Sequence, residues 1–198
     1  MKLREPSSIR ISGMGGQGNI LMGLILAESL VKEGYWVVQS QHYGAQVRGG
    51  LSFCDVLFSE ETIDYPKAET FDVLYLMHDI AFSHLSKVKN NGIIFYDSSY
   101  IKALPQTVAR VTKKIIPIPA SKLAYEKLGN SNVANMIGLG AIAKNCGIVS
   151  LDTLVEVMKK RVNERFYEID EKALKIGYEF VEKKYEIKNN GHSVGRGF

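Results

Sequence analysis

The residues best suited to bind a ligand form a glycine-rich segment near the amino terminus, Gly13-Met14-Gly15-Gly16-Gln17-Gly18. It follows a short apolar run and precedes a helix-like pattern, which is the setting of the G-x-G-x-x-G turn. Glycines in such a turn let backbone N–H groups approach an anion, and the helix N-terminus adds partial positive charge. This context favours an anion-binding turn over a tight turn that serves packing alone.

Two common versions of this turn do not fit the residues that follow it. A phosphate-binding NTPase loop needs Lys and Ser/Thr after its last glycine, whereas Gly18 is followed by Asn19 and Ile20. An NAD site usually has an acidic residue at the end of the second strand, and residues 37–41 read Val-Val-Gln-Ser-Gln. The turn therefore suits a phosphate or another polar ligand, and a nicotinamide cofactor is disfavoured.

A second candidate segment runs from Gln41 to Gly50 and follows the second predicted strand. It should lie at the same carboxyl edge of the sheet as the first turn, where open α/β sheets bind ligands. Arg48 beside Gly49-Gly50 has the chemistry to clamp a phosphate or carboxylate in a bidentate manner. A solvated surface arginine remains the alternative for Arg48. Tyr43 and Gly44 belong to the same segment.

These turns need a sheet to position them, and apolar runs alternating with helical patterns predict one that is covered on both faces. Expected strands are residues 9–11, 35–38, 51–58, 73–77, 93–96 and 115–118. Expected helices are residues 19–33, 80–89, 121–128, 132–145, 151–162 and 171–184, with Asn90 to Gly92 ending the second and Ser150 and Asp170 as N-caps. The fold class is α/β, a Rossmann-like three-layer sandwich with a mostly parallel sheet and a helical C-terminal part. Residues 1–187 should form one domain, followed by a flexible tail, 188–198.

Composition narrows the class of protein. The 198 residues carry a net charge of +4, with Lys and Arg scattered rather than in blocks, so no nucleic-acid surface is indicated. The two cysteines, Cys54 and Cys146, form no metal motif, and a cubane iron–sulfur cluster usually needs four. No apolar run is long enough for a membrane span, and the N-terminus lacks a secretion signal. Reduced, buried thiols and a cytoplasmic location are expected.

Other candidate residues are weaker. The four histidines, His42, His78, His84 and His192, show no metal-ligand spacing, so each is expected to be structural or on the surface. Asp97 and Ser98-Ser99 follow a strand and are candidates for the same carboxyl edge. No Gly-x-Ser-x-Gly elbow surrounds a serine, so a hydrolase triad is unsupported. No catalytic residue is expected in this chain. Gly138 and Gly140 in one apolar helix should pack closely against another backbone, for which a partner subunit is a candidate.

Five segments taken together resemble one family. They are Gly13 to Gly18, Gly23 with Leu26-Ala27, Tyr43-Gly44, Arg48 to Gly50, and Asn135-Met136 with Leu139 to Ala141. This set resembles the gamma subunit of 2-oxoacid:ferredoxin oxidoreductases, the pyruvate/ketoisovalerate oxidoreductase gamma-domain family, with the 2-oxoglutarate (2-ketoglutarate synthase) type nearest. The resemblance extends over roughly residues 8 to 180.

The resemblance implies a division of labour. The family's complete enzyme decarboxylates a 2-oxoacid on thiamine diphosphate, reduces ferredoxin through iron–sulfur clusters, and passes the acyl group to coenzyme A. Thiamine diphosphate and [4Fe-4S] clusters belong to the partner alpha, beta and possible delta subunits, so the isolated chain should be inactive. Coenzyme A is the ligand implied for this chain. Its candidate contacts are Gly13, Gly15, Gly16, Gln17, Gly18, Tyr43, Gly44, Arg48, Gly49 and Gly50.

Two alternatives stay open. The first is the small subunit of an indolepyruvate or pyruvate oxidoreductase, because His42 and residues 45–47 lie where relatives vary with the oxoacid. The second is a stand-alone nucleotide-binding Rossmann-like protein, which the G-x-G-x-x-G turn alone would also suit.

Overall fold

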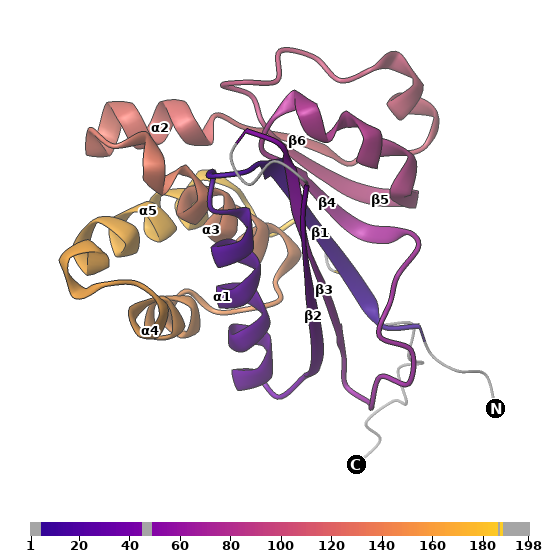
Figure 1. The fold of residues 1–198 in the computed structure, drawn as a ribbon, viewed down its shortest axis with the longest axis horizontal. Coiled ribbons are helices and arrows are strands. Elements are labelled where there is room, and N and C mark those ends of the chain that lie inside the picture. The colour runs from indigo at the N-terminus through magenta and orange to yellow at the C-terminus, as the bar shows by residue number, and fades with distance from the viewer. Residues whose placement is uncertain (1–4, 45–48, 186, 188–198) are drawn as a thin grey trace.

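A six-stranded mixed sheet forms the centre of the computed structural model, which describes residues 5–44, 49–185 and 187 (Figure 1). The predicted tail lies outside these residues. The strands, in the order β2-β3-β1-β4-β5-β6, are β1 (Ser7–Met14), β2 (Trp36–Tyr43), β3 (Leu51–Ser59), β4 (Phe71–Leu76), β5 (Val88–Asp97) and β6 (Ile115–Ile118). Strands β1, β4, β5 and β6 run parallel, and β3 runs antiparallel to both β1 and β2.

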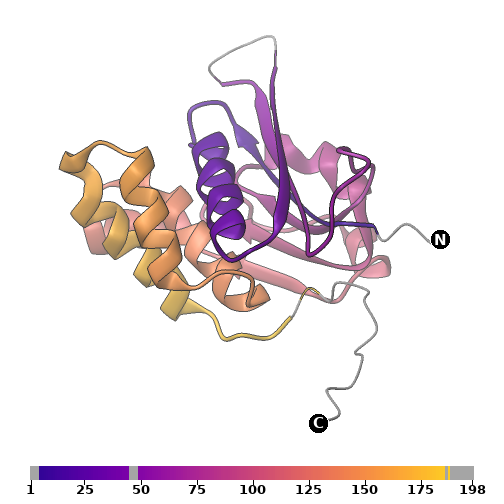
Figure 2. The same ribbon diagram turned by 90° about the horizontal axis from the view of Figure 1, so that it is seen from below.

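Helical segments cover the two faces of the sheet unequally. The α-helices gather on one face (Figure 2), and they are α1 (Asn19–Lys32), α2 (Ala120–Leu128), α3 (Ala134–Cys146), α4 (Leu151–Arg161) and α5 (Tyr167–Phe180). The opposite face of β4 and β5 packs against the 3-10 helices η1 (Asp79–Lys87) and η2 (Gln106–Arg110). Two further 3-10 turns, η3 (Ser131–Val133) and η4 (Glu164–Phe166), precede α3 and α5. The three-layer α/β prediction is confirmed.

The central strands read as continuous apolar runs because both of their faces are buried. On β4, Val73 and Tyr75 face the α-helices, whereas Leu74 and Leu76 join the smaller core beneath η1 and η2. Burying each such side chain stabilises the fold by about 1.5–3 kcal/mol. The two cores hold the carboxyl ends of β1 and β4 side by side.

Two predicted elements differ from the structure. The helix expected over 80–89 is a 3-10 helix, and residues 90–92 belong to β5 rather than to a helix end. Val88 pairs with Phe71, so strand pairing extends backwards through a bulge and overrides the local helical pattern. Strand β2 continues to Tyr43, five residues beyond the expected end, because it pairs with β3 along its whole length.

The predicted N-caps have opposite outcomes. The Thr153 N–H donates to Ser150 Oγ at 3.1 Å, which confirms Ser150 as the N-cap of α4. Asp170 was expected to cap α5, but the helix begins at Tyr167 and Asp170 lies inside it. Burial of this carboxyl raises its pKa to about 6. The cap prediction for Asp170 is therefore wrong.

Glycines allow α3 and α5 to pack backbone against backbone. A Cβ at Gly177 would collide with the Ile137 carbonyl of α3, and a Cβ at Gly140 would collide with the Leu174 carbonyl of α5. Gly138 instead makes room for the Tyr75 ring. The close backbone contact predicted for this helix thus lies within the chain, and the partner subunit offered for that contact is wrong.

We predict that Gly177→Ala destabilises the protein despite the better helix propensity of alanine. The added methyl group has only backbone to push against, and overpacking of this kind costs about 1–3 kcal/mol. Denaturant unfolding measures the change, with Lys175→Ala on the exposed side of the same helix as the control. Equal or greater stability of Gly177→Ala would contradict the close-packing account.

Candidate functional site

The glycine turn begins in the last residues of β1, at the edge of the sheet where β4 also ends (Figure 1). Gly16 and Gly18 have φ angles of 104° and 77°, which glycine adopts without strain. Gly18 is also the N-cap of α1. The turn therefore places a left-handed backbone directly before a helix N-terminus.

The Gln17 side chain fixes the shape of the turn. Its Oε1 accepts a hydrogen bond from the Met14 N–H at 2.7 Å, and its Nε2 donates to the Met77 carbonyl at 3.3 Å. The first bond closes the turn on itself, and the second ties it to the end of β4. A Cβ at Gly13 would lie 2.6 Å from Gln17 Oε1, which explains the glycine there.

The second predicted segment lies against the first. The Gly15 N–H donates to the Gly50 carbonyl at 2.8 Å, and the Gly49 N–H donates to the Gly15 carbonyl at 3.3 Å. Both β1 and β2 run antiparallel to β3, so their carboxyl ends share one edge. The prediction that the two glycine segments meet at this edge is confirmed.

Two backbone N–H groups of the turn are available to a ligand. The N–H groups of Gly16 and Gly18 donate no hydrogen bond to any residue that the structure describes. The first turn of α1 carries no acidic residue, and open space lies around Gly16. Two unpaired amides beside a helix N-terminus form an arrangement that favours an anion.

The remaining predicted contacts lie further away or outside the described residues. Tyr43 is the last residue of β2 and Gly44 follows it, and the Gly44 N–H donates to the Leu51 carbonyl at 3.0 Å. Tyr43 is 60% exposed, and its hydroxyl donates to Gln41 Oε1 at 3.4 Å. Arg48 lies outside the described residues, between Gly44 and Gly49.

Two asparagines that support the turn were not predicted as site residues. The Asn135 amide donates to the Gly18 carbonyl at 3.4 Å, and the Asn19 amide donates to the Ser52 carbonyl at 2.6 Å. A side chain at Gly18 would collide with Asn135. The sequence pointed to Asn135 only as part of a segment that resembles the family. Its contact with Gly18 could not be predicted locally, because the two residues are 117 positions apart.

A buried Ser–His pair lies beneath the turn. Ser12 directly precedes Gly13, and its Oγ lies 2.7 Å from Nδ1 of His84 in η1. Burial, followed by the charges of Arg10, Lys87 and His42, lowers the pKa of His84 to about 4. His84 is thus neutral near pH 7 and holds the end of β1 to η1, as expected for a structural histidine.

Asp97 lies at the same edge but serves a helix instead of a ligand. Its carboxylate accepts hydrogen bonds from the backbone N–H and hydroxyl of Ser121, at 3.0 and 2.6 Å, and from the Ser99 N–H at 2.9 Å. It therefore caps the start of α2. With its oxygens engaged in this way, Asp97 is not expected to contact an anion at the turn.

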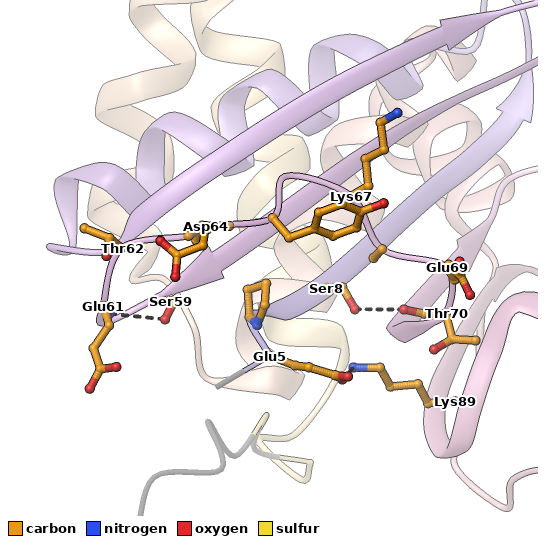
Figure 3. Close-up of a pocket in the computed structure, with 14 residues that line it drawn as sticks. Glu5, Ser8, Ser59, Glu61, Thr62, Asp64, Lys67, Glu69, Thr70 and Lys89 are labelled. Atoms are coloured by element: carbon orange, nitrogen blue, oxygen red, sulfur yellow. Dashed lines mark hydrogen bonds and ion pairs between the residues drawn. The ribbon is translucent and has the colours of Figure 1, made fainter. Parts of the chain in front are cut away.

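A pocket of about 570 Å³ lies at the other end of β1, between that strand and the β3–β4 connection (Figure 3). Its lining includes Glu5, Glu61, Asp64 and Glu69 together with Lys67 and Lys89. Lys89 contacts Asp72 at 3.0 Å and Glu5 at 3.8 Å. The excess of carboxylates disfavours phosphate binding here.

The described residues offer neither a cluster of metal ligands nor a reactive thiol. No group of three or more His, Cys, Asp or Glu side chains there is placed to hold a metal ion. Cys54 and Cys146 are buried free thiols, and burial raises their pKa values to about 11 and about 12. Thiols of such high pKa are poor nucleophiles. No helix in this part of the chain is long and apolar enough to cross a bilayer.

The sheet and its glycine turn define an α/β protein of Rossmann-like architecture. Residues 8–180 match the family model described as pyruvate ferredoxin/flavodoxin oxidoreductase, so the chain belongs to that family.

Similar proteins cover nearly the whole chain. The 2-oxoglutarate synthase subunit KorC of Methanothermobacter marburgensis is 34% identical over 177 residues, 87% of this chain and 95% of that protein. KorC of Archaeoglobus fulgidus is 34% identical over 94% of both chains. The crystal structure of a keto/oxoacid ferredoxin oxidoreductase gamma subunit from Geobacter sulfurreducens superposes with a TM-score of 0.75 at 32% identity, covering 87% of this chain and 96% of that one.

We predict that His84 makes stability depend on pH between about 4 and 6.5. In this range the unfolded histidine takes up a proton that the folded one does not, so stability falls as pH decreases. The free energy of unfolding should decrease from pH 7 to pH 4.5 in the parent protein. In His84→Gln this decrease should be smaller by about 1–3 kcal/mol. His78→Gln is the control. An unchanged difference in His84→Gln would contradict the buried, neutral histidine.

Proposed function

We propose that this chain is the gamma subunit of a 2-oxoacid:ferredoxin oxidoreductase of the 2-oxoglutarate type. Such an enzyme converts a 2-oxoacid, coenzyme A and oxidised ferredoxin into acyl-CoA, CO2 and reduced ferredoxin. The KorC relatives are subunits of 2-oxoglutarate synthases by name, and the match spans most of each chain. The pyruvate synthase subunit PorC of Methanothermobacter marburgensis matches a similar share of this chain at 26% identity, so the 34% identity to KorC favours the 2-oxoglutarate type over the pyruvate alternative.

The observation that carries the role of this chain is the pair of unpaired amides at Gly16 and Gly18, beside Gly49-Gly50. Together they suit a phosphate group, and coenzyme A is the phosphorylated substrate of the reaction. In this proposal the amides of the turn bind one phosphate, and Arg48 contributes a charge-assisted contact to it. The chain positions coenzyme A and makes or breaks no bond itself.

The redox chemistry belongs to other subunits in this proposal. The two cysteines are buried and too few for a cubane cluster, so [4Fe-4S] clusters and thiamine diphosphate are assigned to partner chains. The partners are alpha and beta subunits and a possible ferredoxin-like delta subunit, with ferredoxin as the acceptor of the complex. The cytoplasm is the corresponding compartment, and the isolated chain is inactive.

Purification from the native extract tests the subunit assignment. The chain should co-purify with polypeptides that contain thiamine diphosphate and show iron–sulfur absorbance, and this complex should reduce ferredoxin with 2-oxoglutarate and coenzyme A. Recovery of the chain without any partner polypeptide would overturn the assignment.

The arginine of the second segment tests the coenzyme A site. In the purified complex, Arg48→Ala should raise the KM for coenzyme A about tenfold or more, because a hydrogen bond to a charged group contributes about 1.5–3 kcal/mol. The kcat and the KM for the oxoacid should change little. The KM of Arg48→Lys for coenzyme A should lie between those of the parent and Arg48→Ala. Arg110→Ala in the η2 helix is the control.

If Arg48→Ala leaves the KM for coenzyme A unchanged while the complex stays intact, the turn serves packing and the coenzyme A role is wrong. The subunit assignment would survive that result, since it depends on co-purification.

A further inference from the structure

The two edges of the sheet are protected to different degrees. Edge strand β6 has four residues, contains Pro117 and follows Lys113-Lys114, all of which discourage pairing with another strand. Edge strand β2 has eight residues, pairs with β3 in unbroken register, and contains neither proline nor any Asp, Glu, Lys or Arg. A long, uncharged edge with no proline is the kind that joins another strand.

The hydrogen-bond pattern shows which backbone groups β2 presents outward. The Gly44 N–H donates to the Leu51 carbonyl, so the pairs that exchange hydrogen bonds with β3 involve Trp36, Val38, Ser40 and His42. The alternate residues, Val37, Gln39, Gln41 and Tyr43, direct their N–H and C=O groups away from β3. None of those groups bonds to any other residue that the structure describes.

We infer that two copies of this chain join through antiparallel pairing of their β2 strands. A two-fold axis perpendicular to the sheet keeps each side chain on its own face, so only alternate registers are allowed. The register that uses all four outward residues sets Ser40 opposite the partner's Ser40. Val37 then lies opposite the partner's Tyr43, and Gln39 lies opposite the partner's Gln41. The result is one continuous sheet across both copies.

The side chains of β2 are complementary to themselves in this register. On the helix-covered face, Val37 meets an aromatic ring and the Gln39 amide meets another amide. On the other face, Val38 lies opposite the partner's His42. No acidic or basic pair opposes itself, and the two exposed aromatic residues of the strand, Trp36 at 57% and Tyr43 at 60%, approach the new interface.

Pairing of two copies covers the unpaired backbone groups of both β2 strands, whereas one added strand would not leave every edge protected. Each copy covers the unprotected edge of the other, and only the two β6 edges, which are already protected, remain open. An isolated strand from another polypeptide would instead leave its own outer edge exposed. The occupant that best fits β2 is therefore a second copy of this chain, and this inference stands apart from the coenzyme A role.

Charge variants test both the pairing and its register. The full chain has a mass of 22.1 kDa, and light scattering after gel filtration should give about twice that mass. Val38→Glu with His42→Glu places two carboxylates opposite each other on both sides of the axis, so this variant should be monomeric. Val38→Lys with His42→Glu changes the same two positions but pairs opposite charges, so it should remain dimeric.

A backbone variant gives a second test that does not depend on side-chain charge. Gln41→Pro removes an outward N–H and no bond to β3, so it should yield a folded monomer, whereas Gln41→Thr keeps the N–H and should stay dimeric. Circular dichroism and a cooperative melting transition identify folded variants. A monomeric parent chain would overturn the inference, and so would a dimer that persists in both folded Val38→Glu/His42→Glu and folded Gln41→Pro.

Discussion

The position of β1 in the sheet is the constraint on which the site depends. This strand pairs with parallel β4 on one side and antiparallel β3 on the other, so the turn that leaves it emerges between two loops. The Gln17 side chain joins the turn to the end of β4, and Gly15 joins it to Gly49 and Gly50 in the loop between β2 and β3. The shape of the turn is thus determined from two sides, and the amides of Gly16 and Gly18 donate to no residue that the structure describes.

A buried polar layer supports this arrangement from the face opposite α1. Arg10 pairs with Asp55 on β3 at 2.7 Å, and its guanidinium lies between the rings of Phe53 and Phe71, 4.2 and 4.3 Å from their centroids. Removing one partner of such a pair would leave a buried charge, which costs about 3–5 kcal/mol. These contacts fix the register of β1 against β3, and therefore the position at which the turn leaves the sheet.

Local chemistry made much of this predictable from the sequence. The sequence around Gly13 to Gly18 predicted a strand, a turn and a helix. The predicted strands before the two glycine segments end at the same edge of the sheet, so Gly49 and Gly50 were expected near the turn. The contacts of Gln17 with Met77 and of Asn135 with Gly18 join residues 60 and 117 positions apart, and no local pattern encodes them. For the same reason the backward extension of β5 to Val88 was missed, because pairing with Phe71 outweighs the helical pattern there.

Binding of a coenzyme A phosphate at the turn is tested most directly by a cryo-electron-microscopy structure of the purified complex with coenzyme A. We expect a phosphate within hydrogen-bond distance of the Gly16 and Gly18 backbone nitrogens, with Arg48 beside it. Coenzyme A bound with all of its phosphates away from this turn would contradict this expectation.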